Sequence, residues 1–168
     1  MNRNSSYIYN EKIIDPLKHA QPAQVGVDLT IAKIEEIQSG LAVFDTNSKL
    51  KKDSIQYKEA PYEIVDGIKH YLLRANTNYA IEFEQGLRQL NDNEWGLIIQ
   101  RSSLLRTGCH IISSIWDPGF FTDTMGTTLF TGNTQVSIPV GCRVAQLLIF
   151  DNEPTELYNG TWQGVANH

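Results

Sequence analysis

The sequence predicts an all-β protein, a distorted β-barrel or jelly-roll with one or two short helices. Two observations predict this fold class: the chain contains many short runs of β-branched and aromatic residues, and Gly, Asn, Asp and Pro separate these runs at close intervals. Short strands with frequent turns are typical of barrels and jelly rolls rather than of α/β folds. With 168 residues, 41% of them hydrophobic, the chain is long enough for one domain with a sizeable core.

The expected strands follow one another along the whole chain. In order, they are 25–31, 71–73, 79–83, 95–99, 110–115, 127–130, 135–138 and 144–150. The first could continue as a helix, because Ile31, Ile34 and Ile37 recur every three residues. However, Val27, Leu29 and Ile31 alternate first, so we expect a strand there.

The remaining segments are expected to be less regular. Residues 44–57 carry several lysines and predict an exposed loop. No shift in composition marks a boundary, so residues 1–168 are expected to form a single domain, with flexible arms at 1–12 and 158–168.

Composition excludes several classes of function. The net charge of −5 and the pI near 5.3 argue against a groove for polymeric nucleic acid. Cys109 and Cys142 are single thiols without metal-ligand spacing, so we expect two small buried residues rather than a zinc site or a disulfide framework. No run is apolar enough for a signal core or a membrane span, which leads us to expect a cytoplasmic protein.

The chemistry-bearing residues gather first in the segment 101–108. Arg101, Ser102, Ser103 and Arg106 follow an apolar run, and Gly108 supplies a helix stop, so either serine could be the N-cap of a short helix. Unpaired N–H groups at a helix start, flanked by guanidinium groups, suit a phosphate. A capped surface helix with solvated arginines explains the same pattern without a ligand.

An acidic turn follows this segment. Asp117 precedes Pro118 and Gly119, three residues that each favour a position in a turn. The Asp117 carboxylate could orient water for attack on a phosphoanhydride, although composition alone favours a purely structural turn. Gln146 could add a neutral donor, or simply face outward from its strand.

Together these segments resemble the dCTP deaminase and dUTPase superfamily. Four blocks carry the likeness, in the family's order: 21–29, the pair 101–108 and 117–120, 143–150, and 158–164. The resemblance implies a dUTPase-like fold and a homotrimer with active sites between subunits. It also implies a pyrimidine deoxynucleoside triphosphate as substrate, with Mg²⁺ bound through the triphosphate and not directly by protein side chains.

The resemblance also assigns roles to residues. Asp117 would contact the sugar 3′-hydroxyl and position the attacking water, and Asp28 would support the active site. The closing segment, with Tyr158, Trp162 and Gln163, would fold over the bound nucleotide. Within that segment Thr161 stands where relatives often have a phosphate-binding lysine, a departure that predicts weaker binding of the triphosphate.

The resemblance leaves the reaction open among three functions. Deaminases of the family carry a general acid/base Glu on the strand after the acidic turn, and this chain has no Glu between Glu94 and Glu153. We therefore favour dUTP diphosphatase activity, which converts dUTP and water to dUMP and pyrophosphate. The alternatives are a dCTP deaminase or bifunctional enzyme in which Asp123 replaces the missing Glu, and a catalytically silent nucleotide-binding homologue.

Overall fold

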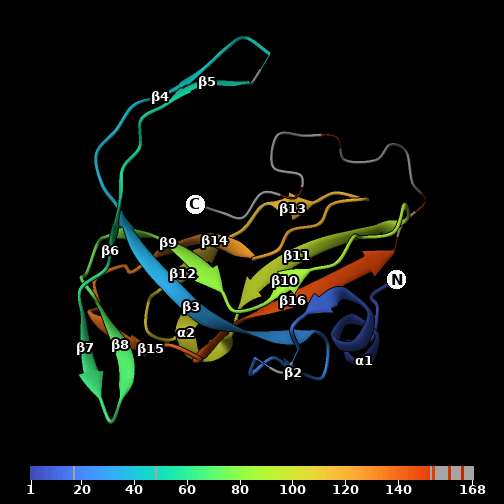
Figure 1. Ribbon diagram of the computed structural model, residues 1–168, viewed down its shortest axis with the longest axis horizontal. Helices are drawn as coiled ribbons and strands as arrows, with labels where there is room; N and C mark the ends of the chain where they lie inside the picture. The colour runs from blue at the N-terminus through green and yellow to red at the C-terminus, as the bar shows by residue number, and fades with distance from the viewer. Residues whose placement is uncertain (17, 48, 152, 154–158, 160–163, 165–168) are drawn as a thin grey trace.

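A curled sheet of nine strands forms the body of the molecule (Figure 1). The computed structural model describes residues 1–16, 18–47, 49–151, 153, 159 and 164, and the nine strands lie within this part of the chain. Seven of these strands lie side by side in the order β12 (His110–Ile112), β14 (Gly126–Phe130), β9 (Asn78–Phe83), β3 (Val27–Ile37), β16 (Arg143–Asp151), β11 (Glu94–Gln100) and β13 (Ile115–Trp116). The other two, β2 (Gln21–Pro22) and β6 (Tyr57–Glu59), both pair with β3. This architecture confirms the predicted all-β class.

Strand β3 joins the two halves of this sheet. Its first residues pair with β16 and its later residues with β9, and the register shifts between Ile31 and Lys33. Such an irregularity bends a strand, which lets one sheet curl around the core. The strand predicted at 25–31 is therefore confirmed, and it continues through the segment where a helix was the alternative.

The apolar side chains fill the interior of the curl, as the alternation of the strands predicts. On β9, Tyr79, Ile81 and Phe83 are at most 3% exposed, whereas Ala80 and Glu82 face outward. The other predicted strands are also present, each end within three residues of the prediction, except that 110–115 is divided. Its first part is β12 and its last residue begins β13, and the two pair with opposite ends of the sheet.

Smaller sheets flank this body. A three-stranded sheet contains β15 (Val136–Pro139), β8 (Ile68–Leu73) and β7 (Tyr62–Val65). The segment expected to be a loop instead contains a hairpin of β4 (Ala42–Phe44) and β5 (Leu50–Asp53), which projects from the body (Figure 1). The residues of β4 and the first two of β5 are exposed, as expected, but the paired backbone was missed because the sequence lacks a clear alternation.

The N-terminal segment, expected to be a flexible arm, forms helical turns against the body. α1 (Ser5–Tyr7) and η1 (Ile8–Lys12) lead into β1 (Ile13–Ile14), which pairs with β10 (Gly86–Leu87). Ile8 is fully buried, and the buried Lys12 forms a 2.8 Å ion pair with Glu94. The expected C-terminal arm lies almost entirely outside the described residues. Among the described residues, no helix is long and apolar enough to cross a membrane.

Candidate active site

A buried carboxylate organises the first candidate site. Asp28 lies on β3, opposite Gln21 of β2 and Gln146 of β16, and is 3% exposed. Its Oδ1 accepts a 2.9 Å hydrogen bond from Gln146 Nε2. Its Oδ2 lies 3.2 Å from an Arg101 guanidinium nitrogen and 3.4 Å from one of Arg143. One carboxylate thus holds two guanidinium groups side by side.

These side chains line an open, mostly polar pocket of about 340 Å³. Asp28, Arg101, Arg143 and Gln146 form one part of its lining, and the segment 22–24 forms the other. Two arginines against one carboxylate leave the cluster with a net positive charge, which favours an anionic ligand. The pocket therefore brings together three of the predicted site residues, Asp28, Arg101 and Gln146.

Gly26 allows the wall of this pocket to approach β16. A Cβ added at Gly26 would lie 2.4 Å from the carbonyl oxygen of Leu147, closer than real contacts allow. The Ala23 N–H donates a 2.8 Å hydrogen bond to the Gly26 carbonyl and closes the turn. A larger residue at this position would displace the segment that walls the arginine pair.

The short helix α2 (Ser102–Leu105) begins beside the pocket. Its N-cap is Arg101, with no side-chain cap, so the prediction of a serine N-cap is wrong. The Arg101 N–H donates to the Val144 carbonyl at 2.9 Å and keeps Arg101 extended, so the helix starts directly after it. Ser102 and Ser103 instead lie exposed in the first turn, where N–H groups have no partner within the helix.

Arg106 ends this helix and is exposed to solvent. The next turn closes at Gly108, which has a φ of +78° and donates its N–H to the Leu105 carbonyl at 3.0 Å. The predicted helix stop is thus confirmed, since this backbone conformation favours glycine. Among the interactions of the described residues, Arg106 has none with Asp28, and it does not line the pocket, so it lies outside the cluster.

Asp117 directly follows β13, which pairs with the beginning of β11, whereas Arg101 follows the end of β11. The predicted turn is present: the Phe120 N–H donates to the Asp117 carbonyl at 3.1 Å, and Gly119 has a φ of +80°. Trp116 pairs with Gly96, and five residues of strand from Gly96 to Arg101 span about 17 Å. A single chain therefore does not bring Asp117 to the arginine pair.

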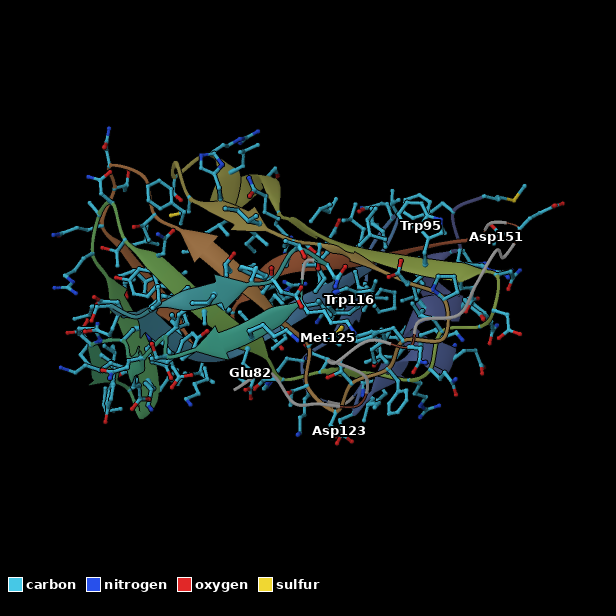
Figure 2. All side chains as sticks on the ribbon, turned by 90° about the horizontal axis from the view of Figure 1, so that it is seen from above. Glu82, Trp95, Trp116, Asp123, Met125 and Asp151 are labelled. Atoms are coloured by element: carbon cyan, nitrogen blue, oxygen red, sulfur yellow. The ribbon has the colours of Figure 1, made fainter. Side chains whose placement is uncertain are left out.

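Asp123, the candidate replacement for the missing Glu, does not line the pocket. Asp123 is exposed, in the connection between the acidic turn and β14, and Figure 2 shows it at the rim of the molecule. Tyr158, Trp162 and Gln163 lie outside the described residues.

Arg143 is a member of the cluster that the prediction of site residues omitted. It contacts both Asp28 and Gln21, which lies on β2 opposite Asp28. The sequence offered one indication of this role: Arg143 lies three residues before Gln146, at the start of the same strand. Burial raises the pKa of the neighbouring Cys142 thiol, and the charges of Arg101 and Arg143 oppose that rise.

The comparisons with known proteins agree with this architecture. A family model described as dCTP deaminase-like matches residues 4–152. This chain belongs to that family. A probable deoxyuridine 5′-triphosphate nucleotidohydrolase from Aeropyrum pernix is 31% identical over 147 residues, which cover 86% of this chain and 84% of the relative. A protein of the same description from Halobacterium salinarum is 28% identical over 151 residues, covering 89% and 87% of the two chains.

A solved structure shows the same fold. The 2′-deoxycytidine 5′-triphosphate deaminase from Agrobacterium tumefaciens superposes with a TM-score of 0.67 at 14% identity. The superposition covers 92% of this chain and 50% of that enzyme, so this family member spans about half the length of the deaminase.

Proposed function

We propose that this protein hydrolyses dUTP to dUMP and pyrophosphate. The observation that carries the proposal is the pair of guanidinium groups that Asp28 holds at the mouth of a polar pocket, beside the first turn of α2. The relatives described as deoxyuridine 5′-triphosphate nucleotidohydrolases support the choice of substrate. The same evidence supports a nucleotide-binding pocket in this family member.

The phosphate chain is the part of the substrate that this pocket would hold. Arg101 and Arg143 would donate charge-assisted hydrogen bonds to phosphate oxygens, each worth roughly 1.5–3 kcal/mol. This phosphate-binding surface, here called the phosphate cradle, would also include the exposed hydroxyls of Ser102 and Ser103 and the guanidinium group of Arg106 at the end of α2. Asp28 acts as a positioning residue, because its oxygens face Gln146 and the two arginines rather than the ligand.

Magnesium would enter as part of the substrate complex. Mg²⁺ on the triphosphate would neutralise phosphate oxygens and help to orient the leaving group. Among the described residues, no group of three or more His, Cys, Asp or Glu side chains could hold a metal ion. Both Asp28 oxygens are engaged with protein groups, so they do not fit as direct ligands.

The attacking water would be positioned by Asp117 from another subunit of a homotrimer. In one chain the five residues from Gly96, the partner of Trp116, to Arg101 already span about 17 Å, and Asp117 lies beyond Trp116, so it needs a second copy to reach that pocket. Large apolar side chains also remain exposed on α2, on β11, at the end of β12 and around the acidic turn. They are Ile99, Leu105, Ile112, Ile115 and Phe121, with 38–61% of their surface exposed. Association of subunits through this surface would bury them.

Incubation of the purified protein with Mg²⁺ and either dUTP or dCTP tests the proposal. We expect dUMP and pyrophosphate from dUTP, resolved by ion-exchange chromatography, and no uracil nucleotide from dCTP. A uracil nucleotide formed from dCTP would instead identify a deaminase or bifunctional enzyme. If neither nucleotide changes while both bind, the protein is a silent homologue and the proposed reaction is wrong.

A further inference from the structure

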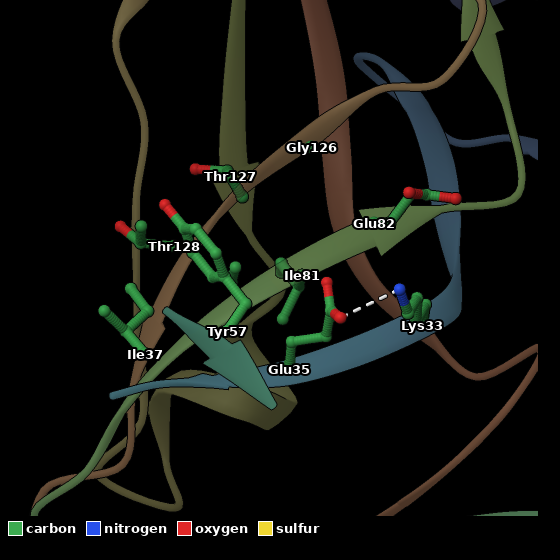
Figure 3. Close-up of a pocket in the computed structure, with 10 residues that line it drawn as sticks. Lys33, Glu35, Ile37, Tyr57, Ile81, Glu82, Gly126, Thr127 and Thr128 are labelled. Atoms are coloured by element: carbon green, nitrogen blue, oxygen red, sulfur yellow. Dashed lines mark ion pairs between the residues drawn. The ribbon is translucent and has the colours of Figure 1, made fainter. Parts of the chain in front are cut away.

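A second cavity lies on the outer face of the sheet, about five residues along β3 from Asp28. Its volume is about 160 Å³, and Figure 3 shows its lining. It is formed mostly by outward-facing residues of β3, β9 and β14 together with Tyr57 of β6, and the inward-facing Ile81 also contributes to the lining. The proposed nucleotide site uses none of these residues, so the cavity needs a separate explanation.

The register of the strands explains why the face is hollow here. Ala80 lies opposite Glu35 of β3, and Gly126 lies opposite Glu82 of β9. Long side chains on β3 and β9 therefore alternate with positions that carry a methyl group or no side chain. Side chains on one face of neighbouring strands stand about 5 Å apart, so small residues between large ones leave a depression. The floor of the cavity is thus built by Ala80 and Gly126.

Three charged groups form one end of the cavity. Lys33 Nζ lies 2.8 Å from Glu35 Oε1, and Figure 3 shows this amine between the carboxylates of Glu35 and Glu82. Within the described part of the chain, the Glu82 carboxylate makes neither a hydrogen bond nor an ion pair. Burial raises the pKa of Glu82, the charge of Lys33 opposes the rise, and the charge of Glu35 adds to it. Two carboxylates and one ammonium leave this end with a net charge of about −1 above the pKa of Glu82.

The other end is apolar and aromatic. Ile37 and the Tyr57 ring lie across the cavity from Glu82 (Figure 3). An aromatic face and an aliphatic side chain provide a wall for a hydrocarbon stem. The cavity is smaller than the roughly 300–1,000 Å³ of pockets for drug-sized ligands, so a single small molecule suits it better than a protein segment.

We propose that this cavity binds a small organic cation, an ammonium or guanidinium group on a short apolar stem. The cationic head would donate hydrogen bonds to the Glu82 carboxylate, and the stem would lie over Ala80 and Gly126 toward Tyr57. The head would compensate the charge of Glu82, because the charges of Lys33 and Glu35 already compensate each other in their ion pair. This site is independent of the nucleotide pocket and does not depend on hydrolysis of dUTP.

Isothermal titration calorimetry of the full chain with n-butylammonium and butylguanidinium chloride tests the proposal, with n-butanol as the uncharged probe. We expect saturable binding of one cation per chain and none of n-butanol. Glu82→Gln keeps the shape of the side chain and removes its charge, so it should weaken binding at least about tenfold. Ala80→Leu fills the floor and should weaken binding as well.

Glu63→Gln is the matched control, because Glu63 is an exposed carboxylate on β7, outside the cavity. It should bind the cations as the unmodified chain does. Circular dichroism shows whether each variant folds, and the isosteric Glu82→Gln decides the matter if Ala80→Leu does not fold. The proposal is overturned if no saturable binding of either cation occurs, if n-butanol binds as tightly, or if Glu82→Gln retains full affinity.

Discussion

Replacing Asp28 by Asn removes the charge that holds the arginine pair while keeping the shape of the side chain. Removing one member of a fully buried ion pair costs about 3–5 kcal/mol. Here the side chains of Arg101 and Arg143 are 33% and 41% exposed, so water compensates part of the loss. We therefore expect Asp28→Asn to lower the free energy of unfolding by about 1–3 kcal/mol.

The same substitution should loosen the phosphate cradle. With Asp28 neutral, the two guanidinium groups repel each other without a shared counter-charge, and their orientation relaxes. We expect the KM for dUTP to rise by about tenfold or more, the equivalent of one charge-assisted hydrogen bond. The two assays are denaturant unfolding, which gives the free energy of unfolding, and steady-state release of pyrophosphate, which gives kcat and KM.

Asp66→Asn is the matched control for Asp28→Asn. Asp66 is exposed in a turn with a φ of +51°, a conformation that Asn tolerates, so its stability and kinetics should remain unchanged. If Asp28→Asn unfolds at the same denaturant concentration as Asp66→Asn and keeps the wild-type KM, the arginine pair does not depend on Asp28. The proposed organisation of the pocket would then be refuted.

Three further substitutions test other parts of the molecule. Asp117→Asn should lower kcat by about 10²–10⁴-fold while binding of dUTP, measured by calorimetry, persists; wild-type turnover would exclude a role for Asp117 in positioning water. Arg106→Ala should weaken binding of the triphosphate by about tenfold, and an unchanged isotherm would remove Arg106 from the cradle. Burial raises the pKa of Glu94, but hydrogen bonds from Lys12, Tyr7 and the Asn91 N–H outweigh this, and the pKa is lowered overall. A carboxyl group with a lowered pKa stabilises the fold above its unfolded pKa of about 4.3, and this stabilisation is lost as the pH falls through the folded pKa. Glu94→Gln should therefore make the free energy of unfolding depend less on pH in the acid range, as measured by denaturant unfolding at several pH values. An unchanged dependence on pH would contradict this.

The periodicity of the strands was sufficient to predict most of the sheet. Alternating burial on β9 and β11 follows directly from sequence, because one face of each strand is apolar, and β16 follows from its continuous apolar run, which is buried on both faces. The β4–β5 hairpin was missed because an exposed hairpin needs no apolar face. The docking of residues 5–12 was missed because it rests on Glu94, which is distant in sequence and meets Lys12 only in the fold.

The candidate site was predictable in its residue types but not in its geometry. Asp28, Arg101 and Gln146 meet because β3 and β11 both pair with β16, a pairing that no local pattern reveals. The serine N-cap was wrong because a tertiary hydrogen bond from Arg101 to Val144 determines where α2 begins. The position of Asp117 was beyond local patterns because it depends on which end of β11 receives β13.

Subunit complementation tests most directly whether Arg101 and Asp117 act together in a shared site. Arg101→Ala and Asp117→Asn should each be inactive alone. Unfolding and refolding an equal mixture of the two should restore activity at about a quarter of the sites, since random assembly of a symmetric homo-oligomer pairs an intact Arg101 with an intact Asp117 that often. A mixture as inactive as its parents, although mixed oligomers form, would contradict a site shared between subunits.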